Sequence, residues 1–226
     1  MVRPSDINVL VACEESQAEC IAFRERGFNA FSCDLQKARY NPDWHILGDV
    51  SQLLCGRSCF TTESGCTVQL DKWHLIVAHP PCTYLCKVSS VHLVSIENGH
   101  RIINQERFAQ MKCAADFFYL CLNAQADFVA VENPLPMALA GLPKPTCFIH
   151  PSWYGVKYTK KTLYWLRNLP PLMAEIDFPQ PHEFVRASRG KYRARTFPQV
   201  ANAIAHQWGD YILDELNKSA AKYCIK

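Results

Sequence analysis

The sequence has no long hydrophobic run, no internal repeat and no low-complexity tract. None of its apolar stretches approaches the ~20 residues that a membrane-spanning helix needs. The N-terminal segment also lacks the apolar core and small-residue cleavage site of a secretory signal. We therefore expect a soluble protein of the cytoplasm. Its 226 residues are 49% hydrophobic, 12% aromatic and 20% charged, which excludes a disordered or collagen-like chain and suits one globular domain.

The sequence also lacks a cysteine pattern typical of small secreted proteins, although it has 12 cysteines. Free thiols in apolar runs pack as small hydrophobic groups, and we expect reduced core residues at Cys13, Cys20, Cys33, Cys113 and Cys121. Cys55, Cys59 and Cys66 suggest zinc, with His45 or His74 as a further ligand, but their spacing is not the tight pairing of structural zinc sites. A hairpin with packing thiols and no metal is the favoured interpretation.

Short apolar runs alternate with amphipathic segments along the chain. This pattern predicts helices over 16–27, 105–124 and 198–216, and strands over 8–12, 29–34, 44–50, 74–78, 127–131 and 162–165. Ser16 and Glu19 have the spacing of a helix capping box. The segment Glu63-Ser64-Gly65 predicts a β-hairpin insertion near 53–70, whereas 134–153 and 170–195 are typical of loops. The alternation predicts a single α/β domain over 1–226 with a mostly parallel, doubly wound sheet.

Polar or reactive side chains follow several predicted strands. They are Cys13–Glu15, Asp34, Asp49, His79–Cys82 and Glu132–Pro134. Ligands of doubly wound sheets bind beyond the carboxyl ends of the strands. We therefore expect these side chains to line one edge of the sheet and to form the functional site.

Two acids at successive strand ends point to an adenosine-containing cofactor. Asp34 is placed to bind a ribose diol and Asp49 to accept from an adenine amino group, although each acid alone is also common in caps and loops. The first turn carries Glu14 and Glu15 instead of a glycine-rich loop, which disfavours a pyrophosphate. A cationic cofactor suits this turn better, and S-adenosylmethionine has both a sulfonium and an ammonium group.

Pro80-Pro81-Cys82 places a cysteine in a stiff turn directly after a buried strand. Cys82 is therefore a candidate nucleophile, with a packing cysteine as the alternative. Glu132 ends the next strand and is a candidate proton donor in the same cleft, with a structural salt bridge as the alternative. His92 and His100 lie in a polar segment after the nucleophile, predicted to be a loop.

The runs VLVACEESQ, SCDL, GDV, AHPPCTYL and VENP, in this order, resemble the motifs of C5-cytosine DNA methyltransferases, in particular the short members carried by phages and prophages. The resemblance implies a Rossmann-like fold that uses S-adenosylmethionine. Residues 155–165 are similar to the family's Gln-x-Arg-x-Arg strand, and 195–208 to its C-terminal helix. The implied catalytic residues are Cys82, Glu132, Asn133 and Lys160. The implied cofactor contacts are Ala12, Cys13, Glu14, Ser16, Asp34, Leu35, Asp49, Val50 and Pro80.

In this resemblance Cys82 adds to C6 of a cytosine that has been extruded from DNA, and Glu132 binds or protonates N3. A short basic segment, 167–195, stands where larger members have a full target-recognition domain. From 157 to 195 nine Lys and Arg accompany three Asp and Glu, a balance that suits phosphates or a solvated loop. The expected DNA contacts are Lys160, Arg186, Arg189, Arg193 and Arg195.

Three hypotheses follow from these residues. The first is a phage-encoded DNA (cytosine-5) methyltransferase acting in the bacterial cytoplasm. The second keeps this chemistry but takes a free pyrimidine nucleotide or single-stranded DNA, because the recognition segment is short. The third is a binding protein that holds the cofactor or DNA without turnover.

Overall fold

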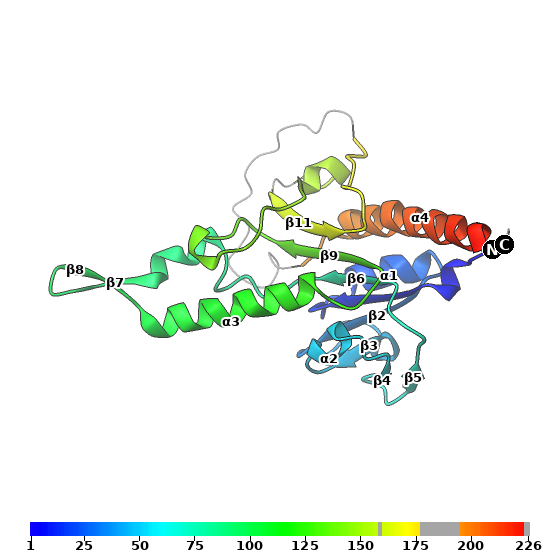
Figure 1. Ribbon diagram of the computed structural model, residues 1–226, viewed down its shortest axis with the longest axis horizontal. Helices are drawn as coiled ribbons and strands as arrows, with labels where there is room; N and C mark the ends of the chain where they lie inside the picture. Colours follow the sequence, from blue (N-terminus) through cyan, green and yellow to red (C-terminus); the bar gives the residue numbers. More distant parts are fainter. Residues whose placement is uncertain (158–159, 177–194, 224–226) are drawn as a thin grey trace.

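The computed structural model describes residues 1–157, 160–176 and 195–223 (Figure 1). Its centre is a seven-stranded sheet in the order β10-β11-β9-β6-β1-β2-β3. Neighbouring strands from β3 to β9 are parallel, whereas β11 is antiparallel to both β9 and β10. The strands are β1 (Asn8–Ala12), β2 (Asn29–Asp34), β3 (His45–Leu47), β6 (Leu75–Ala78), β9 (Phe128–Asn133), β10 (Cys147–Ile149) and β11 (Thr162–Arg167). The predicted α/β class and mostly parallel sheet are confirmed.

Helices cover both faces of the sheet, because the central strands carry buried apolar side chains on both faces. Val9 and Val11 of β1 belong to the core under α1 (Ala18–Glu25) and α4 (Pro198–Tyr223). Leu10 and Ala12 point the opposite way, into the core under α2 (Ser51–Leu54) and α3 (Gln105–Leu122). Alternate side chains of one strand thus fill two cores, as expected for a sheet buried on both sides.

Helix α4 lies against α1 and closes the first of these cores (Figure 1). Trp208 is fully buried, and its ring packs edge-on against Tyr164 of β11 with 5.7 Å between centroids. The next residue is Gly209. A Cβ atom at this position would lie 2.8 Å from the ring of Phe28. The close approach of α4 to the sheet therefore requires a residue without a side chain at this position.

Two antiparallel hairpins stand outside the main sheet. The first pairs β4 (Cys59–Thr61) with β5 (Thr67–Gln69), within the range where the sequence predicts a hairpin. The second pairs β7 (Val94–Glu97) with β8 (His100–Ile103), follows the 3-10 helix η3 (Lys87–Leu93), and projects from the body as an arm (Figure 1). A polar loop was predicted here. Ile96 of this arm is 74% exposed and Val88 of η3 is 84% exposed, so this region presents apolar side chains to solvent.

Several predicted boundaries are wrong. Glu132 and Asn133 are the last residues of β9 rather than the residues after it, and α4 continues to Tyr223. The predicted loop 134–153 contains β10 and two short 3-10 helices, η4 (Ala138–Ala140) and η5 (Pro151–Tyr154). The remaining 3-10 helices are η1 (Pro4–Asp6) and η2 (Pro42–Trp44).

The cysteines of the described ranges are all free thiols. Cys20, Cys33 and Cys121 are buried as predicted, but Cys113 is exposed on α3, so its predicted place in the core is wrong. Within the same ranges, no three His, Cys, Asp or Glu side chains gather as a metal-binding group. No helix in the described part of the chain combines the length and apolar character needed to cross a membrane.

Candidate active site at the carboxyl edge of the sheet

The chain reverses its direction across the sheet between β1 and β6, and the functional side chains gather there. Ala12, Ala78 and Val131 are register partners near the ends of β1, β6 and β9. The residues that follow them therefore start side by side, at the point where ligands of open α/β sheets bind. Cys13, His79 and Glu132 are the first of these residues on the three strands.

Cys82 lies in the turn after β6 and is half-buried. Its carbonyl accepts from the backbone N–H groups of Leu85 and Cys86, at 3.0 Å each, which fixes the turn. Burial raises the pKa of the Cys82 thiol, and the nearby Cys86 and Glu132 add to this effect, whereas Lys160 opposes it. Cys82 is therefore a thiol at neutral pH, and its proton must leave as it attacks an electrophile.

Glu132 shares this environment with Cys82. Its Oε2 lies 3.6 Å from Nδ1 of His79. Burial would raise the pKa of Glu132, but the interactions with His79 and Lys160 outweigh it and hold that pKa below its usual value. Glu132 is thus a carboxylate at neutral pH, close enough to Cys82 to influence its ionisation.

Asn133 has a different position from Glu132 because successive strand residues face opposite ways. It is fully buried, and its Nδ2 donates to the carbonyl of Pro80 at 3.5 Å. Its Oδ1 has no hydrogen-bond partner within the described residues. Asn133 therefore ties the Pro-Pro turn that carries Cys82 to the end of β9.

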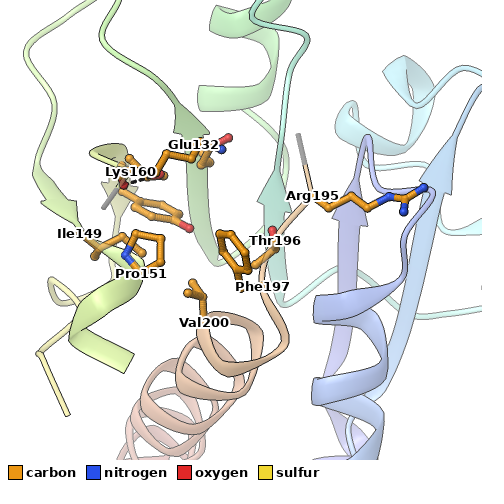
Figure 2. A pocket seen from close by; sticks show the side chains of 10 residues that line it. Glu132, Ile149, Pro151, Lys160, Arg195, Thr196, Phe197 and Val200 are labelled. Atoms are coloured by element: carbon orange, nitrogen blue, oxygen red, sulfur yellow. Dashed lines mark hydrogen bonds between the residues drawn. The ribbon is translucent and has the colours of Figure 1, made fainter. Parts of the chain in front are cut away.

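Lys160 precedes β11 and faces Glu132 across the top of a small pocket (Figure 2). Phe197 and Val200, at the start of α4, form the opposite wall in Figure 2. The pocket has about 30 Å³ of space, enough for a water molecule.

The turn after β1 is organised by its own side chains. Glu14 is 4% exposed, and its carboxyl oxygens accept from the backbone N–H groups of Glu19 and Cys20, at 2.8 and 3.3 Å. Glu14 thus caps α1, so the predicted capping box of Ser16 and Glu19 is wrong. Gln17 takes the N-cap position with a left-handed φ of 55°. Burial and the negative charge of Glu19 raise the pKa of Glu14 to about 8, although the amides of Glu19 and Cys20 and the nearby His79 oppose this shift.

Asp34 and Asp49 occupy neighbouring strand ends on the other side of this turn. Oδ1 of Asp34 accepts from Gln36 N at 2.8 Å, and Oδ1 of Asp49 accepts from the amide and hydroxyl of Ser51 at 2.8 and 2.7 Å. These hydrogen bonds use one oxygen of each carboxylate. Leu35 is 78% exposed beside them. Two carboxylate acceptors next to an exposed apolar side chain suit the ribose and adenine of an adenosyl group.

The other predicted cofactor residues have less accessible positions. Ala12 is fully buried within β1, and Val50 and Ser16 are 5% and 6% exposed. Pro80 is also buried. Cys13 is half-buried with a left-handed φ of 62°, and its N–H donates to the carbonyl of Cys33 at 2.7 Å. These residues shape the backbone around the candidate cofactor position, and their direct contacts with a cofactor stay predictions.

The predicted DNA contacts are only partly within the described residues. Nε of Arg195 lies 3.2 Å from Oε1 of Glu15, and its side chain points away from the pocket (Figure 2). Arg195 therefore links the segment before α4 to the turn after β1. Arg186, Arg189 and Arg193 lie outside the described residues.

His79 was predicted to lie at the ligand edge but without a role in the reaction, and Glu19 was not predicted to belong to the site. Nε2 of His79 lies 3.1 Å from Oε1 of Glu19, which is fully buried on the first turn of α1. The position of His79 directly after β6 was a signal, since it falls on the predicted ligand edge. Nothing in the sequence marked Glu19 as a site residue, because the predicted capping box already explained its spacing from Ser16.

The comparisons with known proteins give distant similarities to solved structures alone. No family model matches the sequence, and no curated protein matches it. Among solved structures, the chain is similar to an Escherichia coli protein described as a "putative DNA modification methyltransferase encoded within prophage". The match has 14% identity and a TM-score of 0.38, and it covers 71% of this chain and 46% of the other. This chain thus spans about half the length of that protein. A match at this level identifies neither a family nor a substrate.

Proposed function

We propose that this protein methylates C5 of cytosine in DNA, using S-adenosylmethionine and a covalent adduct at Cys82. The observation that carries the proposal is the convergence of Cys82, Glu132 and Lys160 at the carboxyl edge of the sheet. A nucleophile, a group that can hold a proton at the base, and a cation beside both are the side chains that this reaction needs.

The topology of the sheet supports a methyltransferase of the Rossmann-like type. The parallel strands β3, β2, β1, β6 and β9 follow the order of a doubly wound nucleotide-binding sheet. The antiparallel strand β11 lies between β9 and β10, and a reversed strand at this place is typical of the methyltransferase version of the fold. The motifs that resemble the cytosine-5 family lie at the strand ends of this sheet.

The residues fit the adenosyl part of the cofactor. Asp34 would hold the ribose hydroxyls and Asp49 the adenine amino group, with Leu35 against the ring. Glu14 is committed to the cap of α1, so we do not assign it to the ammonium group. When bound, S-adenosylmethionine supplies an electrophilic methyl group on a positively charged sulfur.

Cys82 and Glu132 act on different atoms of the base. Sγ of Cys82 forms a bond to C6 and loses its proton to water, while the electron pair of the C5–C6 double bond moves to C5 and, through C4, toward N3. Glu132 stabilises the resulting charge by holding a proton at N3. After C5 has gained its methyl group, water takes the C5 proton, the C5–C6 double bond forms again and the Sγ–C6 bond breaks. Cys82 leaves as a thiolate and takes a proton from water.

Trapping of the adduct tests this proposal. The protein is incubated with labelled S-adenosylmethionine and duplex DNA containing 5-fluorocytosine, in which fluorine blocks the loss of the C5 proton. We expect a covalent complex for the wild type, none for Cys82→Ala, and an unchanged complex for Cys113→Ala, which removes an exposed cysteine of α3. Absence of both adduct and methyl transfer for the wild type would reject the function.

The same assay separates the possible substrates. Single-stranded DNA and the free nucleotide are tested beside the duplex. Labelling of the nucleotide alone would assign the chemistry to a nucleotide-modifying enzyme. Binding of S-adenosylmethionine or DNA without labelling of any substrate would assign the chain to a non-catalytic binding protein.

A further inference from the structure

Three ionisable side chains form a row behind Cys82, and they come from three different elements. Glu19 lies on α1, His79 follows β6, and Glu132 ends β9. His79 stands between the two carboxylates, with Nε2 3.1 Å from Glu19 and Nδ1 3.6 Å from Glu132. The row therefore runs from the buried interior to the wall of the pocket.

Glu19 is the buried end of this row. Its side chain is fully buried, and Oε1 also accepts from the hydroxyl of Thr196 at 3.0 Å. A buried carboxylate needs a positive partner or several hydrogen bonds to remain stable in the folded protein. Its other oxygen, Oε2, has no hydrogen-bond partner within the described residues. His79 is therefore the principal compensating group for Glu19.

The two carboxylates decide the charge of His79. Burial alone would lower the pKa of the imidazole, but Glu19 and Glu132 outweigh burial and raise that pKa well above its usual value. His79 is then an imidazolium at neutral pH, with Nε2 within ion-pair distance of Glu19 and Nδ1 within ion-pair distance of Glu132, although Nε2 makes no hydrogen bond within the described residues. Other titratable groups near this row are Glu14 before α1, Lys160 before β11, Tyr164 on β11 and Cys82 in the turn of His79.

The charge of Glu132 poses a chemical problem for the proposed reaction. Neutral cytosine has an unprotonated N3, which accepts a hydrogen bond, and a carboxylate cannot donate one. Glu132 is ionised in the free protein because His79 and Lys160 stabilise its charge. A proton must therefore reach Glu132 before it can protonate N3, and the imidazolium beside it holds one.

We propose that His79, oriented by Glu19, stores the proton that Glu132 delivers to N3 of the base. The inference rests on the proposed function. His79 acts through Glu132 and is a positioning residue, and Glu19 positions His79 in turn. The 3.6 Å separation between His79 and Glu132 exceeds a normal hydrogen bond, and such contacts often shorten when substrate binds.

One proton moves from His79 to the base and returns in this step. The Nδ1–H bond of His79 breaks, and its proton passes to Oε2 of Glu132. Glu132 gives a proton to N3 while the Sγ–C6 bond of Cys82 forms. His79 is left as a neutral imidazole that keeps its proton on Nε2, 3.1 Å from Oε1 of Glu19. When Cys82 leaves the ring, the proton returns from N3 through Glu132 to His79.

The first part of the test measures the protonation state of His79 without any reaction. Long-range ¹H–¹⁵N spectra of the full-length protein are recorded across the pH range, and the His79 signals are assigned from their absence in His79→Gln. We expect an imidazolium at neutral pH in the wild type. In Glu19→Gln the midpoint of the titration should fall by about one pH unit or more. A neutral His79 at pH 7 in the wild type would overturn the proposal.

The second part measures single-turnover methylation of duplex DNA from about pH 5.5 to about pH 9. His79→Gln should lower the maximal rate by about 10- to 100-fold with little change in the affinity for DNA. Its residual rate should rise as the pH falls, because Glu132 must then take its proton from solvent. The matched control is His206→Gln, on the exposed surface of α4, which should keep the wild-type rate and pH profile.

The outcomes distinguish this inference from the function on which it rests. An active wild type with an unaltered pH profile in His79→Gln refutes the proton store and leaves the methyltransferase intact. A wild type that transfers no methyl group to any substrate refutes both. Thermal unfolding of each variant shows whether a loss of rate follows from a loss of structure.

Discussion

Replacement of Glu14 by glutamine is expected to remove a large part of the pH dependence of stability. Glu14 is buried under the N-terminus of α1, and its pKa is about 8 in the folded protein. An exposed glutamate of the unfolded chain ionises near pH 4.5. Between these values the unfolded chain releases a proton that the folded protein retains. The folded state is therefore destabilised as the pH rises from about 4.5 to about 8.

The size of this effect follows from the two pKa values. One pH unit corresponds to about 1.4 kcal/mol per titrating group, so Glu14 alone lowers the free energy of unfolding by up to ~5 kcal/mol across this range. Glutamine keeps a carbonyl oxygen that can accept from the amides of Glu19 and Cys20, and it does not ionise. The difference in stability between Glu14→Gln and the wild type should therefore shift in favour of the variant as the pH rises.

Urea denaturation at about pH 5, 7 and 9 measures this difference. The control is Glu25→Gln, the same chemical change at an exposed position of α1, which should follow the wild type at every pH. If Glu14→Gln shows the same pH dependence as the wild type, Glu14 is ionised in the folded protein and the reasoning from its burial is wrong.

Three further substitutions probe the fold and the arm. Trp208→Ala removes the largest side chain of the core under α4 and should cost about 3–5 kcal/mol in urea denaturation; a loss below about 1 kcal/mol would contradict its full burial. Gln17→Ala removes hydrogen bonds to the amides of Tyr40 and Asn41, and protection from hydrogen exchange should fall at these two amides, whereas unchanged protection would refute their dependence on Gln17. Ile96→Asn changes a 74% exposed side chain of the arm and should leave the melting temperature unchanged, because little apolar surface is buried at this position; a clear fall in the melting temperature would contradict its exposure.

The arrangement of the strand ends could be predicted from the sequence because it depends on a general property of parallel sheets. Carboxyl ends of parallel strands share one edge, so residues after buried apolar runs converge there regardless of the loops between them. Cys82 and Glu132 follow this logic. Asp34 and Asp49 follow it as well, since β2 and β3 are also parallel to β1.

Contacts that depend on side-chain direction could not be predicted in this way. Which residue of the first helical turn faces the sheet is decided by the packing of α1, and this packing turned Glu19 toward His79 instead of toward a local cap. Glu14 caps the helix instead. The left-handed backbone conformation of Cys13 places the carboxyl group of Glu14 under the N-terminus of α1. Strand β10 was not predicted, because it has only three residues and lies among prolines.

The packing of α4 against α1 has a consequence for biosynthesis. Helix α1 is made early, yet the surface that covers it belongs to the last helix of the described chain, and contacts such as Val2 with Asn217 join positions 215 residues apart. Until α4 leaves the ribosome, one side of the nascent sheet keeps its apolar residues in water. Completion of this half of the molecule must therefore wait until α4 has been synthesised, and chaperones that bind apolar segments can act on α1 during this time.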